Sequence, residues 1–115
     1  AHKHGKKMFM HSDGNTLRII PKLIDLGLDA MNSQIFCMGV ENLAQYRGHL
    51  TFWGEIDRQN LIPNGTKADI DAAVRKVYDT LWKGGGCIAQ CEFGPGANPD
   101  NVYRIYEQWA ALRPE

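Results

Sequence analysis

Four short apolar runs divide the chain, and a segment with helical character follows each of them. The runs cover residues 7–11, 28–33, 49–54 and 87–91. Their length is typical of buried β-strands, and no two-residue hairpin turn joins one run to the next. A strand followed by a helix, repeated four times, predicts a parallel sheet wound in one direction.

Start and stop signals mark the helices between these runs. Pro21 suits the first turn of a helix that ends at Gly27, and a short helix is expected over residues 40–46. Thr66 and Asp69, three residues apart, resemble a capping box at the start of the longest helix. The apolar residues of this helix recur at helical spacing and predict one buried stripe: Ile70, Val74, Val77, Tyr78 and Leu81.

The last helix is expected to begin at the pair Asn98-Pro99, because proline is favoured in the first helical turn. Its predicted buried stripe consists of Val102, Ile105, Tyr106 and Trp109. Four strand-helix units make half of an eightfold (β/α)8 barrel, whose usual length is ~250 residues. We therefore interpret residues 1–115 as one α/β domain with the architecture of half a TIM barrel, cut from a longer protein.

Composition narrows the classes of function. Lys and Arg number 13, as do Asp and Glu, and no basic stripe alternates with aromatic residues. The electrostatic footprint of a nucleic-acid-binding protein is therefore absent, and we expect no binding to DNA or RNA. No apolar run approaches the ~20 residues of a membrane span, so we expect no membrane insertion and a cytoplasmic location. The cysteines Cys37, Cys87 and Cys91 show no disulfide framework spacing, which agrees with a reducing compartment.

Polar side chains gather where the apolar runs are expected to end. The carboxyl ends of parallel strands converge on one face of an α/β fold, and ligands bind there. We expect a shared site at this face. Its candidate residues are His11, Asp13, Asn32, Gln34, Trp53, Glu55, Asp57, Arg58 and Cys91.

Three of these candidates, His11, Asp13 and Cys91, are residue types that bind metal ions. His11 and Asp13 are two residues apart on an extended segment, so both face the same way, and Cys91 adds a third donor that zinc accepts. The structural alternative is that Asp13 caps the next helix or binds the Gly14-Asn15 turn, while His11 is a core histidine with its hydrogen bonds satisfied. Asp13 could also act as a base, and no metal is then required.

Substrate contacts are expected at the end of the third run. Glu55, Asp57 and Arg58 place carboxylates beside a guanidinium, which suits a substrate clamp; the alternative is a solvated loop with a surface ion pair. Trp53 flanks the expected mouth and suits a flat ligand, although aromatic residues near strand ends more often belong to the core or the rim.

The second and fourth runs end in further polar residues. Asn32 and Gln34 are able to bind a ligand by hydrogen bonds, and turn formation explains Asn32 equally well. Glu92 follows Cys91 directly. Because neighbouring strand residues point to opposite faces, we expect Glu92 to face away from the site.

At these residues the sequence resembles the uroporphyrinogen decarboxylase superfamily, which also contains methylcobalamin:coenzyme M methyltransferases and related corrinoid-dependent enzymes. The similarity extends over the whole chain and matches the C-terminal half of that barrel. In the methyltransferase branch, a His-x-Cys-Gly motif and a later Cys, ten residues before an Asn, together bind zinc. Here His11-Ser12-Asp13-Gly14 matches the first motif with Asp13 in place of the thiolate, and Cys91 lies ten residues before Asn101. The segment 53–57 is similar to the Gly-Asn-x-Asp segment of the decarboxylases.

The resemblance implies a zinc-dependent methyltransferase in which a metal-activated thiol attacks a methyl group carried by a corrinoid. It places His11, Cys91 and Asp13 at the metal, and we expect Asp13 and Asp57 to be catalytic. A second implied function is decarboxylation of a tetrapyrrole such as uroporphyrinogen, whose arginines would lie in the N-terminal half. The third alternative is an inert half-barrel fragment or interaction module.

The expected partners follow from the same interpretation. They are a small-molecule substrate, a corrinoid protein and a second copy of the chain. Four strands of a barrel leave two unpaired edges and one apolar concave face, which favours self-association that completes the barrel.

Overall fold

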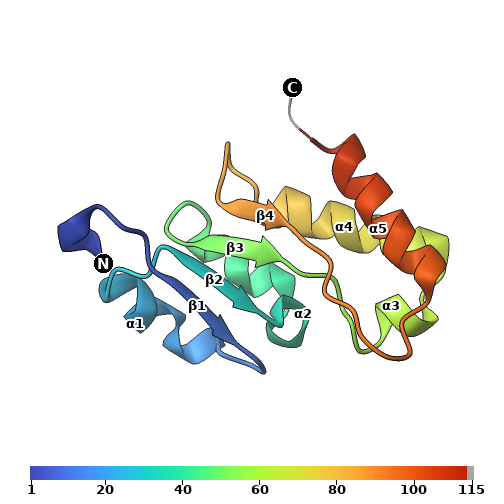
Figure 1. The fold of residues 1–115 in the computed structure, drawn as a ribbon, viewed down its shortest axis with the longest axis horizontal. Coiled ribbons are helices and arrows are strands. Elements are labelled where there is room, and N and C mark those ends of the chain that lie inside the picture. Colours follow the sequence, from blue (N-terminus) through green and yellow to red (C-terminus); the bar gives the residue numbers. More distant parts are fainter. Residues whose placement is uncertain (114–115) are drawn as a thin grey trace.

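The structure, a computed structural model, describes residues 1–113 and shows one sheet of four parallel strands (Figure 1). The strands lie side by side in the order of the sequence: β1 (Phe9–Ser12), β2 (Ala30–Ser33), β3 (Thr51–Gly54) and β4 (Cys87–Ala89). The α/β class and the parallel arrangement predicted from the strand-helix repeat are confirmed.

Helices fill the connections between the strands. The α-helices are α1 (Ile20–Asp25), α2 (Ile35–Met38), α3 (Leu61–Asn64), α4 (Lys67–Leu81) and α5 (Pro99–Ala111). Short 3-10 helices are η1 (His2–His4), η2 (Leu17–Ile19) and η3 (Val40–Tyr46). Among the described helices, none combines the length and the apolar character needed to cross a bilayer.

The two long helices begin where the sequence predicts. Asp69 donates its backbone N–H to Thr66 Oγ1 at 3.2 Å, and its carboxylate accepts the backbone N–H of Thr66 at 2.9 Å, which completes the capping box. Asn98 caps α5 by accepting the backbone N–H of Asp100 at 3.0 Å. Both caps satisfy N–H groups that the first turn of a helix leaves without a partner.

The sheet has one covered face and one bare face. Met31 pairs with Phe52 in register, and both are fully buried in the core on the side of the helices, where α4 contacts β3. Figure 1 shows α2 and α4 behind the strands. On the opposite face the exposed fractions of Phe9 and Ile88 are 47% and 43%. We call this the bare face; it carries Phe9, His11, Asn32, Trp53 and Ile88.

Two details differ from the prediction. The strand expected over 87–91 ends at Ala89, so Cys91 lies beyond it. Tyr106, predicted to be buried in the stripe of α5, is 50% exposed, and its hydroxyl lies 3.4 Å from the carbonyl oxygen of Cys91. Ile105 and Trp109 form the buried part of that stripe.

Candidate functional site

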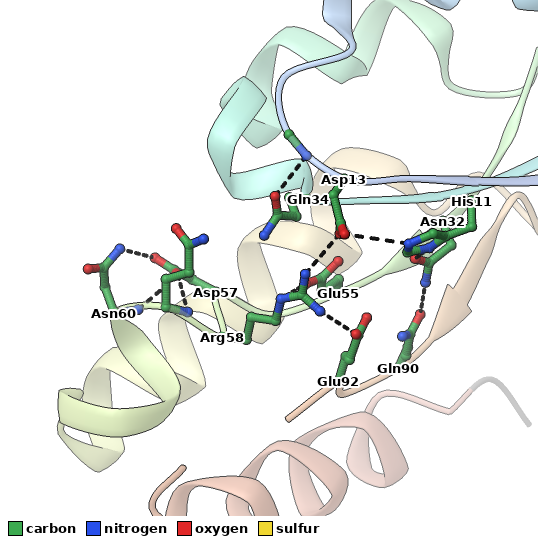
Figure 2. Close-up of polar contacts among 12 residues, drawn as sticks. His11, Asp13, Asn32, Gln34, Glu55, Asp57, Arg58, Asn60, Gln90 and Glu92 are labelled. Carbon is green, nitrogen blue, oxygen red and sulfur yellow. Dashed lines mark hydrogen bonds and ion pairs between the residues drawn. The ribbon is translucent and has the colours of Figure 1, made fainter. Parts of the chain in front are cut away.

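Polar side chains from all four strand ends gather at the carboxyl end of the sheet (Figure 2). The chain leaves each parallel strand at this end, so residues that are distant in sequence come together here. The gathered residues are His11 in β1 and Asp13 after it, Asn32 in β2 and Gln34 after it, Glu55 and Arg58 after β3, and Gln90 and Glu92 after β4.

Arg58 lies at the centre of this group. Its Nη2 donates to Asp13 Oδ1 at 2.8 Å, and its Nη1 donates to Glu92 Oε1. Its Nε lies 3.7 Å from Glu55 Oε1. We call these four residues the Arg58 cluster. One guanidinium is shared among three carboxyl groups, so the cluster has an excess of negative charge when they are ionised.

Glu55 is the buried member of the cluster, with a residue exposure of 3%. Among the described residues, its carboxyl group has the long ion pair with Arg58 and no hydrogen bond. Burial, together with the negative charges of Glu92 and Asp13, raises the pKa of Glu55 to about 7 against the opposing charge of Arg58. This carboxyl group is therefore able to give or take a proton near neutral pH.

A chain of hydrogen bonds crosses the bare face. His11 Nδ1 lies 2.7 Å from Asn32 Oδ1, and Asn32 Nδ2 donates to Gln90 Oε1 at 2.8 Å. We call these three residues the amide row. Asn32 is almost fully buried, with 3% exposure. The other ring nitrogen, His11 Nε2, lies 3.7 Å from Asp13 Oδ1, next to the Arg58 cluster.

Two of the predicted site residues, Gln34 and Asp57, bind backbone N–H groups of the loops around the site. Gln34 Oε1 accepts the backbone N–H of Gly14 at 2.8 Å and so holds the loop after β1. Asp57 Oδ1 accepts the backbone N–H groups of Gln59 and Asn60, both at 3.0 Å, just before α3. Figure 2 shows Asp57 turned toward Asn60 and away from the Arg58 cluster. The structure therefore gives no support to Asp57 as a member of that cluster.

The remaining predicted residues lie beside the cluster. Trp53 stacks on Phe9 on the bare face, with ring centroids 4.9 Å apart and an interplanar angle of 28°. Cys91 is buried, and burial together with the charge of Glu55 raises the pKa of its thiol to about 11. Its sulfur is therefore protonated at neutral pH in this arrangement.

The sequence interpretation missed two members of the site. Glu92 was expected to face away, and this expectation is wrong: β4 ends at Ala89, so strand alternation no longer applies and Glu92 binds Arg58. Gln90 carries a signal that could have been used, because it is the polar residue within the otherwise apolar run 87–91. Gln90 is half-buried and its side chain accepts a hydrogen bond from Asn32.

The zinc set predicted from the sequence does not form in this arrangement. The 3.7 Å between His11 Nε2 and Asp13 Oδ1 is near the ~3.4 Å expected for two tetrahedral zinc ligands. Asp13 is, however, bound by Arg58, and Cys91 is a buried thiol. Within residues 1–113, no group of three His, Cys, Asp or Glu side chains is close enough to hold a metal ion. We therefore derive no reaction step through zinc.

Comparison with known proteins adds no family name. No family model matches the sequence, and neither does any curated protein. The similarity to the uroporphyrinogen decarboxylase superfamily thus stays a prediction.

Proposed function

We propose that the chain is the C-terminal half of a TIM barrel of the uroporphyrinogen decarboxylase superfamily, with the bare face lining the interior. Helices on one face only, with strands in sequence order, are typical of a barrel wall. The bond between Asn32 and Gln90 also supports this proposal, because it joins side chains from β2 and from the end of β4 across β3. Side chains two strands apart meet most readily on the concave side of a curved sheet.

A second copy of the chain is the partner that we propose for completing the barrel. β1 and β4 are the edges of the sheet, and each carries an exposed apolar side chain on the bare face, Phe9 in β1 and Ile88 in β4. A twofold axis along the barrel would place β1 of one copy beside β4 of the other with all strands parallel. Sedimentation at micromolar concentration should show a dimer, and a monomer would contradict this part of the proposal.

For the reaction, we propose that the site takes a proton from a neutral nucleophile, such as a thiol, in preparation for group transfer. The observation that carries this proposal is Glu55: a buried carboxyl group that has no hydrogen bond to residues 1–113, beside a guanidinium that is already shared. A narrow recess with room for about one water molecule is lined in part by Gln34, Glu55 and Arg58.

The chemistry of the site residues follows from their charges. Arg58 stabilises the ionised carboxylate of Glu55, which accepts the proton of the nucleophile and becomes a neutral carboxylic acid. A methyl-corrinoid, when bound, supplies the methyl group in the methyltransferase branch of the superfamily. The excess of carboxyl groups in the Arg58 cluster disfavours an anionic substrate. For this reason, decarboxylation of a tetrapyrrole that carries several propionates fits the cluster less well.

The test measures the rate of methyl transfer from methylcobalamin to small thiols, and absorbance of the corrinoid monitors the reaction. The neutral thiol 2-mercaptoethanol and the cationic thiol cysteamine should react faster than anionic mercaptoethanesulfonate. Glu55→Gln should lower the rate by roughly 10² or more, as expected for loss of a general base. The matched control is Asp79→Asn, because Asp79 pairs with Arg75 on the surface of α4, far from the strand ends.

Two results would contradict this proposal. An inactive dimer would support the inert-module alternative, and an active Glu55→Gln variant would exclude Glu55 as the base.

Zinc-dependent thiol activation is the second candidate, and the spacing of His11 Nε2 and Asp13 Oδ1 favours it. It requires Asp13 to leave Arg58 and Cys91 to lose its proton. Metal analysis of the purified protein tests this candidate. Stoichiometric zinc that is lost in both His11→Ala and Cys91→Ala would support it, and metal-free active protein would exclude it.

A further inference from the structure

The orientation of the Asn32 amide determines the direction of its hydrogen bond to His11. Asn32 Nδ2 donates to Gln90 Oε1 at 2.8 Å, so the other atom of the same amide, Oδ1, faces His11. A carbonyl oxygen accepts but does not donate. The nitrogen 2.7 Å from it, His11 Nδ1, must therefore carry the proton of the bond.

A proton on Nδ1 determines the state of the other ring nitrogen of His11, Nε2. In a neutral imidazole, one nitrogen is the donor and the other is an acceptor. With the proton on Nδ1, the lone pair of Nε2 points to the side where Asp13 Oδ1 lies 3.7 Å away. Figure 2 shows the ring of His11 beside Asp13, a member of the Arg58 cluster.

We infer that Asn32 and Gln90 are positioning residues that hold His11 as the Nδ1–H tautomer and so keep Nε2 as a free acceptor in the site. A ligand group that suits this acceptor is a hydrogen-bond donor, such as a hydroxyl, thiol or ammonium group. The role in substrate binding rests on the proposed function, whereas the tautomer itself does not.

Burial makes this arrangement specific. Asn32 is 3% exposed, so water cannot easily replace its partners, and loss of either hydrogen bond would leave a buried amide group without one. The row also joins segments far apart in the sequence, since Asn32 lies 21 residues from His11 and 58 residues from Gln90. The orientation of His11 therefore depends on the docking of the last strand.

The test is nuclear magnetic resonance of the ¹⁵N-labelled chain, in which two-bond proton–nitrogen correlations identify the protonated ring nitrogen. The spectra are recorded in mildly alkaline solution, because the tautomers are distinguished in the neutral imidazole. His11→Gln assigns the signal. The exposed His49 serves as the internal control, because it lies outside the amide row. We expect an acceptor-type Nε2 for His11.

Two pairs of variants separate positioning from simple packing. Gln90→Glu keeps an acceptor for Asn32 and should leave the tautomer unchanged, whereas Gln90→Leu removes the acceptor and should give a mixture of tautomers. Asn32→Asp keeps the acceptor for His11 and should preserve the Nδ1–H form, whereas Asn32→Leu should lose it. Gln90 lies outside the strands, so its variants remain informative if those of Asn32 fail to fold.

The experiments distinguish failure of the positioning role from failure of the proposed methyl transfer. A protonated Nε2 in the wild-type chain, or a tautomer that does not change in Gln90→Leu and Asn32→Leu, would overturn the positioning role. The expected tautomer in a chain without methyl transfer would leave the positioning role intact and contradict the proposed function alone.

Discussion

The carboxyl group of Glu55 lies 3.7 Å from Arg58 Nε, yet the pKa of Glu55 is raised to about 7 and not lowered. Burial outweighs the attraction of the guanidinium, and the negative charges of Glu92 and Asp13 act in the same direction as burial. A carboxyl group that titrates near neutrality at the end of a parallel sheet is a typical feature of acid–base sites.

The pKa of Glu55 predicts how stability depends on pH. The pKa is 4.5 as the ordinary value and about 7 in the folded chain, so the folded state binds more protons between these values. The free energy of unfolding should therefore fall as the pH rises from 4.5 to about 7. Glu55→Gln removes this dependence. Relative to the wild type, it should gain roughly 2–3 kcal/mol on going from acidic to mildly alkaline pH.

Urea denaturation at several pH values measures this difference. The control is Glu107→Gln, because the side chain of Glu107 is 65% exposed and pairs only with Arg104 within the described chain. If the stability of Glu55→Gln fell with pH in parallel with the wild type, the raised pKa would be wrong.

Replacement of Arg58 should destabilise the chain in a pH-dependent way. Arg58→Leu leaves Asp13, Glu55 and Glu92 without their shared cation, and we expect a loss of about 1–3 kcal/mol at mildly alkaline pH. The loss should be smaller in acid, where the carboxyl groups are protonated. Arg58→Lys should recover only part of the stability, because an ammonium group lacks the planar fork that contacts several carboxylates. An equal loss at both pH values would indicate lost packing and not lost charge.

Gly54 is predicted to tolerate no side chain. A Cβ at this position would lie 3.0 Å from Val77 Cγ1, 3.1 Å from Cys87 Sγ and 3.3 Å from Trp109 Cη2. Gly54→Ala should therefore cost about 1–3 kcal/mol through overpacking, measured by thermal denaturation. Gly94→Ala is the matched control, because a Cβ there meets no atom within 4 Å. Equal stability of the two variants would show that the core beside β3 has free space.

The three cysteines should react at different rates with a thiol reagent. Burial raises the pKa of Cys87 and of Cys91 to about 11, whereas Cys37 is exposed. We expect one fast phase with a disulfide reagent such as DTNB at neutral pH, and its loss in Cys37→Ser. All three thiols should react quickly in denaturant. A fast phase that persists in Cys37→Ser would reveal a second accessible, ionised thiol.

The sequence predicts the fold because its signals are local. A strand-helix repeat without hairpins dictates parallel strands, and the capping box of Thr66 and Asp69 marks the start of α4 within one turn. These features depend on residues within a few positions of each other. They are therefore visible before any tertiary contact is known.

The site is less predictable because its contacts depend on where strands end. Glu92 was assigned to the wrong face, because β4 ends two residues before the apolar run does. Asp57 was expected to be catalytic, but its carboxylate is occupied by the backbone N–H groups of Gln59 and Asn60. Neither the early strand end nor this local turn follows from alternation of apolar and polar residues.

The contacts of Arg58 also determine when the site is able to form during synthesis. Asp13 precedes Arg58 by 45 residues, and Glu92 follows it by 34. On the ribosome, the first two partners emerge early, while the third emerges shortly before the C-terminal helix. A nascent chain that stops before Glu92 has the guanidinium but not its complete set of counter-charges, so the cluster is assembled only after Glu92 has been made.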